Sequence, residues 1–429
     1  MAPCASVLTF GNGGQGALGL GDTSDSYSPE PVTQLPQDIA GVAAGHYHSL
    51  AWTAGEGRLF TWGRNAEQQL GRLTQDTGPH NVDAVPGSVI ALPGKVVGAA
   101  ASGVASFAVD ALGCVWSWGT SKRGQLGQGT GITQSAQPQR LPGLEGIVSV
   151  ACGWGHALAL REDGQVFAWG YPAHGRLGNF FDTGSEQADE GRISERCAWT
   201  PQPVAALCGV KARQVRCSLD SSTVLTSADA GNHILTFGDN SLGQLGRDSL
   251  NHQGGKDAIL WVLHGTDGEP LCATSITAGL SQSMAVLCSG QVAVWGWQHG
   301  LEGLPETPVR PEPIPGLAVP ANDEHALSKS ISERVHIAAG RVHSLIAAPS
   351  EALSFWDAAE GPFSTQWSLQ DEGWRGDALL SWGNGQNGRL GLGSSESIGE
   401  PEVVAELEGY QILDMACGHD HSLVLAAKA

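Results

Sequence analysis

Residues 380–391 read LSWGNGQNGRLG, and six further segments repeat this twelve-residue phrase. Each copy begins as a short run that ends in Trp-Gly or Phe-Gly, and all but one copy close in Leu-Gly. The other six copies are LTFGNGGQGALG (8–19), FTWGRNAEQQLG (60–71), WSWGTSKRGQLG (116–127), FAWGYPAHGRLG (167–178), LTFGDNSLGQLG (235–246) and AVWGWQHGLEGL (293–304). Self-similarity at a step of 51 to 87 residues indicates a repeat architecture.

A second phrase alternates with the first. It consists of two small residues, a glycine, two variable positions, a polar residue and an apolar run. Its copies are AAGHYHSLAW (43–52), ASGVASFAVD (101–110), ACGWGHALAL (151–160), RCSLDSSTVL (216–225), TAGLSQSMAV (277–286), AAGRVHSLIA (338–347) and ACGHDHSLVL (416–425). We interpret the phrase as an inner strand, a tight turn with two free positions, and a second strand.

Each repeat unit therefore contains four predicted strands. The Trp-Gly phrase supplies the third strand, and a proline-containing segment such as PEPV (29–32) or PEVV (401–404) supplies the fourth. Proline lacks a backbone N–H and belongs on an edge strand. Seven units of four strands, without helical periodicity, predict an all-β, seven-bladed β-propeller.

The order of the two phrases predicts how the ring closes. The chain begins with a Trp-Gly phrase and ends with the other phrase, so strands from about 412–427 and about 6–33 should share the last blade. Closure across the termini removes the free edges of the ring. We expect one propeller domain over residues 1–429, with four insertions, at about 179–200, 247–270, 318–334 and 349–378.

Composition excludes several classes of function. The chain has 23 Lys and Arg against 43 Asp and Glu, a net charge of −20, so phosphate backbones and anionic membranes should repel it. Nine scattered cysteines without a CxxC pair indicate reduced thiols. No signal peptide or membrane-spanning segment is visible, and we expect a cytoplasmic protein, with the nucleus as the alternative.

The two phrases together, Trp-Gly…Gly-Gln-Leu-Gly followed by Ala-Cys-Gly-x-x-His-Ser, resemble the regulator of chromosome condensation repeat family. The resemblance covers nearly the whole chain and implies a seven-bladed propeller. Its members include an exchange factor for the small GTPase Ran, a plant ultraviolet-B receptor and many interaction modules. The resemblance alone does not choose among these functions, since one fold hosts unrelated tasks.

The repeated polar and aromatic positions have a structural explanation. His48, His156, His343 and His421 share one repeat position with Ser106, Ser221 and Gln282, which favours buried polar groups that hydrogen-bond at the inner turn. The repeat tryptophans, of which Trp62 and Trp118 are examples, should pack between blades. An ultraviolet-B receptor-like protein would need Gly-Trp-x-His in consecutive repeats, and only 153–156 matches.

Chemistry of other kinds finds little support. Histidines near the ring closure, GHYHS (45–49) and GHDHS (418–422), could bind zinc, but their spacing recurs for repeat reasons. Cys152, Cys217 and Cys417 share one repeat position and should be small core residues. The Gly-rich phrases lack Gly-Lys-Ser/Thr. We predict no catalytic residues, no metal site and no cofactor.

The function predicted from these observations is a non-enzymatic protein–protein interaction propeller. The alternatives are a guanine-nucleotide exchange factor for a small GTPase and, on the single matching motif, an ultraviolet-B photoreceptor-like protein. Exposed aromatic residues and variable turn positions are the candidate binding surfaces. The candidate partner-binding residues are His46, Tyr47, Trp154, Arg341, His419 and Asp420 in the inner turns, and Trp356, Phe363, Trp367 and Trp374 in the last insertion. We expect a protein partner, with a small GTPase as one candidate, and neither nucleic acid nor membrane.

Overall fold

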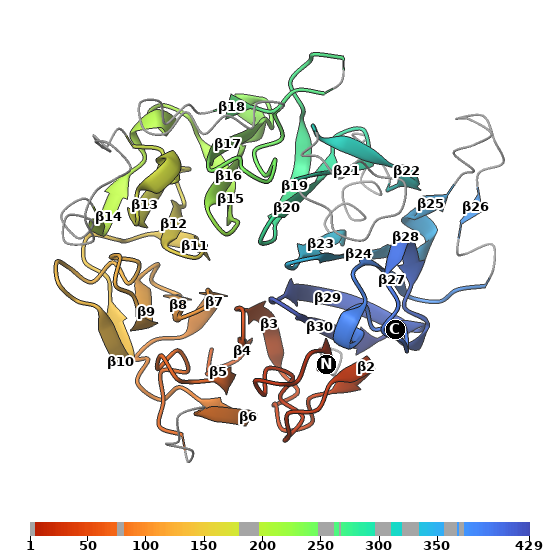
Figure 1. Cartoon of the computed structure of the whole chain (residues 1–429), viewed down its shortest axis with the longest axis horizontal. Helices are drawn as coiled ribbons and strands as arrows, with labels where there is room; N and C mark the ends of the chain where they lie inside the picture. Colours follow the sequence, from red (N-terminus) through yellow and green to blue (C-terminus); the bar gives the residue numbers. More distant parts are fainter. Residues whose placement is uncertain are drawn as a thin grey trace.

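The structure is a computed structural model that describes nine ranges of the chain. The ranges are 5–74, 81–179, 197–247, 261–265, 267–296, 310–319, 334–355, 367–368 and 373–429. In them the chain forms seven antiparallel sheets, which stand as blades around one axis (Figure 1). The seven-bladed all-β propeller is confirmed.

Blades 1 to 5 each use consecutive strands, in order from the axis outward. Blade 1 has β3 (Ile39–Ala44), β4 (His48–Thr53), β5 (Leu59–Arg64) and β6 (Val82–Ser88). Blade 2 has β7 (Val96–Ala101), β8 (Ala105–Asp110), β9 (Val115–Thr120) and β10 (Gln134–Arg140). Blade 3 has β11 (Ile147–Cys152), β12 (His156–Arg161), β13 (Val166–Gly170) and β14 (Ala198–Pro203). Blade 4 has β15 (Ala212–Cys217), β16 (Ser221–Thr226), β17 (Ile234–Gly238) and β18 (Trp261–Val262).

Blade 5 keeps this order, and blades 6 and 7 depart from it. Blade 5 has β19 (Ala273–Ala278), β20 (Gln282–Leu287), β21 (Gln291–Gly296) and β22 (Glu312–Ala318). Blade 6 has β23 (His336–Ala339), β24 (His343–Pro349), β27 (Asp377–Gly383) and β28 (Ile398–Val403). Blade 7 has β29 (Tyr410–Cys417), β30 (His421–Lys428), β1 (Ala5–Gly11) and β2 (Ser26–Pro31). Short 3₁₀ turns are η1 (Ala173–Gly175), η2 (Ala205–Leu207), η3 (Ala228–Ala230), η4 (Ser350–Ala352), η5 (Gln386–Gly388) and η6 (Ala405–Leu407).

The ring closes in blade 7, as the order of the phrases predicted. β1 pairs antiparallel with β30, from Ala5 opposite Ala427 to Gly11 opposite His421. The backbone N–H of Asn12 adds a hydrogen bond of 2.8 Å to the carbonyl oxygen of Asp420. The two termini therefore lie in one blade (Figure 1). Hydrogen bonds between the two ends of the chain hold the whole ring shut.

The Trp-Gly phrase has a backbone reason for its glycine and a packing reason for its tryptophan. Gly63 has a φ of 106°, which only glycine adopts at little cost, and a Cβ there would lie 2.6 Å from the carbonyl oxygen of Tyr47. Trp62 is fully buried, and its indole N–H donates to the carbonyl oxygen of Ala17 in the preceding blade at 2.8 Å. Trp118 and Trp169 make the equivalent bond to Gln69 and Gln125. These tryptophans join neighbouring blades, as expected.

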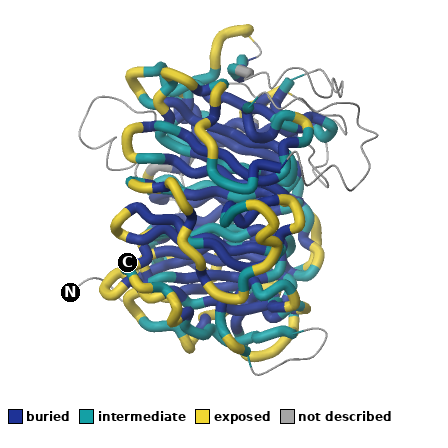
Figure 2. The backbone as a smooth tube through the Cα atoms, turned by 90° about the vertical axis from the view of Figure 1, so that its left-hand side faces the viewer, coloured by how far each residue is buried: buried dark blue, intermediate teal, exposed yellow. Residues whose placement is uncertain are grey.

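Close approach at the axis explains the small residues of the second phrase. A Cβ on Gly418 would lie 2.6 Å from the carbonyl oxygen of Gly45 in the next blade. Backbone hydrogen bonds also cross between blades at this point, such as Trp154 N–H to the Leu219 carbonyl at 2.9 Å. Figure 2 shows the buried backbone running through the stacked blades, with exposed segments in the turns.

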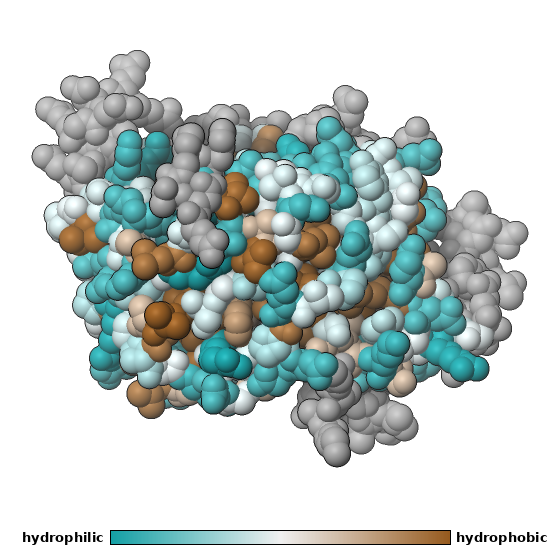
Figure 3. All heavy atoms as spheres, turned by 90° about the horizontal axis from the view of Figure 1, so that it is seen from below, coloured by the Kyte–Doolittle hydropathy of each residue, from teal (hydrophilic) through white to brown (hydrophobic). Residues whose placement is uncertain are grey.

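The fourth strands lie at the outer edge of their sheets, except in blade 5. There β25 (Ser354–Phe355) pairs with β22, and β26 (Trp367–Ser368) pairs with β25, which gives a six-stranded sheet. Both short strands belong to the insertion at 349–378, so it reaches from blade 6 onto the edge of blade 5 (Figure 1). In Figure 3, apolar residues form separate groups among polar ones on the edge of the ring that it shows. Most residues of the other three predicted insertions lie outside the described ranges.

Candidate functional site

The inner turns join the first and second strands of each blade, and in blades 1, 3, 6 and 7 the histidine after the turn links two blades. His48 Nε2 lies 2.7 Å from Ser106 Oγ in the next blade, and Ser106 Oγ donates to the carbonyl oxygen of Gln69 at 2.7 Å. Since the serine uses its only hydrogen on the carbonyl, the histidine must donate from Nε2. The same arrangement joins His156 with Ser222, His343 with Ser422, and His421 with Ser49.

These four inter-blade histidines are buried and neutral near pH 7. Burial, together with nearby His421 and His46, lowers the pKa of His48 to about 3. Burial likewise lowers the pKa of His156 and His343 to about 3 and that of His421 to about 4. The structural interpretation of this repeat position is supported, because the side chains lie between blades and not at the surface.

The predicted equivalence of Ser106 with the histidines is wrong. Ser106 lies opposite Trp118, as Ser49 lies opposite Trp62, and Ala105 lies opposite Gly119, as His48 lies opposite Gly63. Ala105 therefore occupies the histidine position of blade 2, and Ser106 is the serine acceptor. The cause is Ser102, which takes the glycine position of the turn and caps it with its own hydroxyl, 3.1 Å from the Ala105 N–H.

The two free positions of the inner turns lie at the mouth of the axis. His46, Trp154, Arg341 and His419 occupy the first free position of their turns, and Tyr47 and Asp420 occupy the second. We call these six residues the inner-turn arc. The ring centroids of His46 and Trp154 are 5.0 Å apart, those of His46 and His419 are 5.3 Å apart, and Tyr47 stacks on His419 at 5.4 Å. The structure thus brings the predicted inner-turn residues together.

A glycine in blade 2 permits the contact between blades 1 and 3. Gly103 occupies the first free position of that blade, between His46 and Trp154. A Cβ on Gly103 would lie 3.0 Å from His46 Nδ1 and 3.4 Å from the Trp154 ring. The absence of a side chain at Gly103 lets Trp154 reach across a whole blade. Trp154 is nevertheless 47% exposed, while His46 beneath it is buried.

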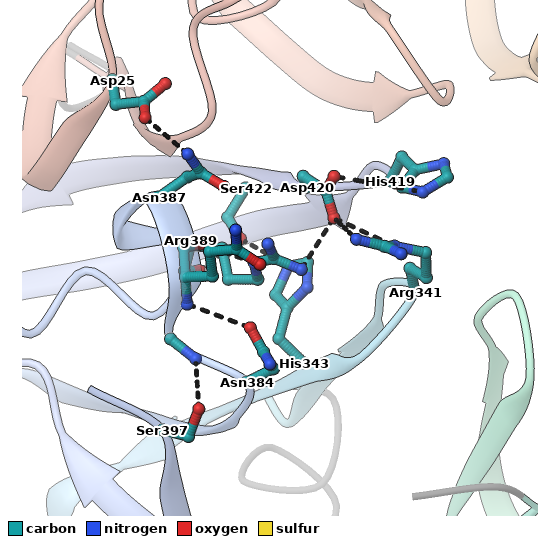
Figure 4. A network of polar contacts seen from close by, with 12 residues as sticks. Asp25, Arg341, His343, Asn384, Asn387, Arg389, Ser397, His419, Asp420 and Ser422 are labelled. Carbon is teal, nitrogen blue, oxygen red and sulfur yellow. Dashed lines mark hydrogen bonds and ion pairs between the residues drawn. The ribbon is translucent and has the colours of Figure 1, made fainter. Parts of the chain in front are cut away.

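Asp420 is the polar centre of the arc (Figure 4). Its Oδ1 accepts hydrogen bonds from Arg341 at 2.9 Å and from Arg389 at 2.7 Å. Burial works against ionisation of this carboxyl group, but the two guanidinium groups outweigh it and lower its pKa. His419 Nε2 lies 4.0 Å from the other carboxylate oxygen. Burial lowers the pKa of His419 and, to about 4, that of His46.

Two buried arginines were not predicted from the sequence. Arg389 lies in the Gly-Arg-Leu-Gly turn of blade 6 and pairs with Asp420 of blade 7, and Arg176 lies in the same turn of blade 3 and pairs with Asp220 of blade 4. In the Gly-Gln-Leu-Gly turn of blade 2, Gln125 instead donates to the backbone carbonyl of Gly153 at 2.7 Å. The sequence does contain a signal, because each arginine in this turn is followed in the next inner turn by an aspartate.

The axis opens at the arc into a cavity of about 80 Å³, room for several water molecules. Its wall includes Trp154, Leu219 and Leu280, together with Cys152, Cys217 and Cys417. Burial raises the pKa of Cys417 to about 12 and also raises the pKa of Cys152 and Cys217. Thiols held in the neutral form are poor nucleophiles and metal ligands.

Metal-binding clusters and membrane-spanning helices are both absent from the described ranges. In those ranges, no cluster of three His, Cys, Asp or Glu side chains has a geometry suited to a metal ion. The same part of the chain contains no helix with the length and apolar character needed to cross a membrane.

Of the four aromatic residues predicted as binding residues in the last insertion, the structure describes the side chain of Trp374 alone. Trp356 and Phe363 lie outside the described residues, and for Trp367 the structure describes only its backbone, in β26. Trp374 is half-buried against the apolar core of blades 5 and 6, and its indole N–H lies 3.3 Å from the carbonyl oxygen of Asp377. The sequence leaves two interpretations of these aromatic residues open, partner binding or packing within the protein, and for Trp374 the packing interpretation fits better.

Comparison with known proteins places the chain in a family. The RCC1-like domain matches residues 6–359, and the regulator of chromosome condensation (RCC1) repeat matches residues 377–425. The RCC1 domain-containing protein RUG3, mitochondrial, of Arabidopsis thaliana is 29% identical over 78% of this chain and 71% of its own length. The ultraviolet-B receptor UVR8 of the same plant is 26% identical over 94% of this chain and 78% of its own length.

A solved structure agrees with the fold. Prp20p of Saccharomyces cerevisiae superposes with a TM-score of 0.74 at 23% identity, covering 100% of this chain and 93% of that chain. Three findings agree with one another: the two family matches cover most of the chain, the repeat forms seven blades, and Prp20p superposes on the ring. The chain belongs to the regulator of chromosome condensation (RCC1) family.

Proposed function

We propose that this chain is a non-enzymatic interaction propeller that binds a protein partner through the inner-turn arc. The observation that carries the proposal is Trp154, a large aromatic side chain that stays 47% exposed at the mouth of the axis while the His46 ring packs against it. Tryptophan is enriched among the residues that dominate binding energy, and such residues cluster near the centre of an interface. Stacked blades hold the arc rigid, which lowers the entropy cost of binding.

The relatives agree with a binding role in general terms. The structure of Prp20p was described together with its binding properties to Gsp1p and histones, so a propeller of this fold can carry protein-binding surfaces. The polar positions of this chain that could suggest catalysis are engaged between blades, such as His156 with Ser222. These observations support an adaptor or regulatory role over a hydrolytic one.

Exchange of guanine nucleotides on a small GTPase is the alternative. It rests on family membership and on the insertion at 349–378, whose β25 pairs with β22 of blade 5. The test is nucleotide release from a panel of purified small GTPases with and without the propeller. Acceleration that depends on the insertion would favour exchange, and no acceleration at micromolar propeller would remove this alternative.

The cellular location is proposed on compositional grounds. We propose the cytoplasm, with the nucleus as the alternative, from the nine scattered cysteines without a CxxC pair. One relative, RUG3, is named as mitochondrial. Fractionation of cells that express the full chain decides among the three compartments.

The binding proposal is tested by affinity capture from native lysate with intact protein, Trp154→Ala and Leu112→Ala as baits. Leu112 is the matched control, because it is 81% exposed in the turn between β8 and β9, on the opposite face. We expect Trp154→Ala to weaken capture of the partner by about 30-fold, as removal of a central tryptophan typically does. Leu112→Ala should keep it. Equal capture by all three baits would move the binding surface away from the arc.

A further inference from the structure

The inner-turn arc ends in a cationic group at blade 6. Asp420 is one carboxylate shared by two guanidinium groups, so Arg341, Arg389 and Asp420 together carry one net positive charge, which nearby Asp25 offsets in part through Arg389. Arg389 is buried, whereas the Arg341 side chain is 38% exposed and reaches from its turn toward Asp420 (Figure 4). Arg341 uses Nε and Nη2 on Asp420. An anion brought to this end of the arc would therefore meet a guanidinium group that is already held in position.

A second cationic group lies at the other end of the arc, on blades 2 and 3. The Arg123 guanidinium carbon lies 4.5 Å from the Tyr171 ring centroid, and the Arg176 carbon lies 5.3 Å from it. Tyr171 contacts the turn that carries Trp154, because a Cβ on Gly155 would lie 3.4 Å from the Tyr171 Cβ. Asp220 neutralises Arg176. Lys122 and Arg123 are exposed, and neither has a carboxylate partner among the described residues.

An uncharged aromatic surface separates these two cationic groups. Trp154, His46, Tyr47 and His419 form it, and both imidazoles are neutral near pH 7 because burial lowers the pKa of each. The pair of Arg64 and Glu67 beside Tyr47 adds no net charge. The arc is thus apolar in its middle and positive at both ends.

The rest of the molecule has the opposite electrostatic character, since the chain carries a net charge of −20. An acidic partner would be repelled by the molecule as a whole and attracted locally by the cationic groups at the ends of the inner-turn arc. Such an arrangement orients a partner as it approaches and suppresses other binding modes. A basic partner would be drawn to many acidic sites and would gain nothing at the arc.

We infer that the partner of the inner-turn arc presents an acidic segment, with an apolar or aromatic side chain flanked by carboxylates. The apolar side chain packs on Trp154, and the carboxylates reach Arg341 at one end and Lys122 with Arg123 at the other. This inference rests on the proposed function and adds the chemistry of the partner. Guanidinium groups recognise carboxylates with two hydrogen bonds, which gives direction as well as charge.

Selection from a display library of random peptides on the intact protein tests the inference. The library is selected in parallel on the unaltered chain and on the variant Trp154→Ala. Peptides are ranked by how much more strongly the unaltered chain enriches them. We expect the enriched peptides to be acidic, with an aromatic or large aliphatic residue between carboxylates. No enrichment over Trp154→Ala would contradict the binding role of the arc itself. Enriched peptides of basic or neutral composition would leave that role standing and overturn the acidic partner.

A charge-reversal pair measures the contribution of the second cationic group. The probe is a labelled synthetic copy of the most enriched peptide, titrated by fluorescence anisotropy. We expect the double variant K122E/R123E to weaken binding about tenfold, since it loses two exposed ion pairs. The double variant K95E/K211E, which makes the same charge change in exposed segments on the opposite face, should bind as the unaltered chain does. Equal weakening by both pairs would overturn the inference.

Two further probes separate carboxylate recognition from a general attraction to anions. A copy of the peptide with Asn and Gln in place of Asp and Glu should lose binding. A single-stranded oligonucleotide of equal charge should bind more weakly than the acidic peptide, since it lacks the flanked apolar side chain. Binding of the oligonucleotide as tight as that of the peptide would contradict an acidic protein segment as the occupant.

Discussion

His156 and Trp154 lie two positions apart in one inner turn, and they have opposite environments. His156 is buried and bonded to Ser222 of the next blade, while Trp154 is 47% exposed at the mouth of the axis. The same contrast separates His48 from Tyr47 in blade 1. In these two turns the side chain at the histidine position is buried between blades, while Trp154 and Tyr47, at free positions, are at least partly exposed. The histidine position builds the ring and the two positions before it supply the arc, where His46 is buried beneath Trp154 and Asp420 also pairs with Arg389 of blade 6.

Opening the ring should destabilise the protein more than any single substitution between blades. Deletion of residues 1–33 removes β1 and β2 and leaves β30 paired with β29 alone, so His421 loses the closed blade around it. We expect the cooperative thermal transition of the full chain to be lost, as followed by circular dichroism. Deletion of residues 1–4 alone, which stops short of β1, should keep the melting temperature. A chain lacking 1–33 that melts like the full chain would contradict closure through blade 7.

Asp420→Ala tests a residue that belongs to the inner-turn arc and also joins blades 6 and 7 through Arg389. It leaves Arg389 buried without its carboxylate, and an unpaired buried charge typically costs about 3–5 kcal/mol. We expect the free energy of unfolding, measured by urea titration, to fall by that amount. The double variant R389Q/D420V reproduces the combination of Gln69 with Val104 found between blades 1 and 2, and it should recover most of the loss. Equal stability of the single and double variants would show that the charge pair is not the cause.

The buried histidines predict a loss of stability on acidification. The folded-state pKa of His48 is about 3, against an ordinary value of 6.5, so below pH 6.5 the unfolded chain binds a proton that the folded chain excludes. Each such histidine should reduce the free energy of unfolding by about 1.4 kcal/mol per pH unit between about pH 5.5 and its folded pKa. Asp414 acts in the opposite sense, because burial raises its pKa to about 6.

His48→Gln isolates one histidine from the others. Glutamine occupies this position naturally in blade 5, where Gln282 donates to the carbonyl oxygen of His343 at 2.8 Å. Urea titrations at several pH values give the slope of the free energy of unfolding against pH. For His48→Gln this slope should be smaller by about 1.4 kcal/mol per pH unit than for the unaltered chain. His46→Gln is the comparison variant at a free position. Its free energy of unfolding should also depend less steeply on pH at first. Near pH 4, where folded His46 takes up its own proton, this dependence should match that of the unaltered chain. An unchanged slope in His48→Gln would contradict a neutral buried imidazole.

The repeat predicted the fold, the closure of the ring and the arrangement of the inner turns. It did so because the two phrases impose a backbone requirement, such as the positive φ of Gly63, that any blade must satisfy. Contacts between blades were harder to predict. These contacts join residues far apart in sequence and depend on the register of the strands. Examples are the pair of Arg389 with Asp420, the space left by Gly103, and the pairing of β25 with β22. The register of blade 2 was missed because Ser102 stands where a glycine was expected.

The most direct test measures stability and binding for Trp154→Ala and His156→Ala side by side. We expect Trp154→Ala to change the free energy of unfolding by less than about 1 kcal/mol and to lose partner capture. His156→Ala should lose about 2–3 kcal/mol, because it leaves a cavity and removes the donor to Ser222 Oγ, yet it should keep the partner at temperatures where it is folded. If Trp154→Ala destabilises the ring as much as His156→Ala, or keeps its partner, the division between ring-building and binding positions is wrong.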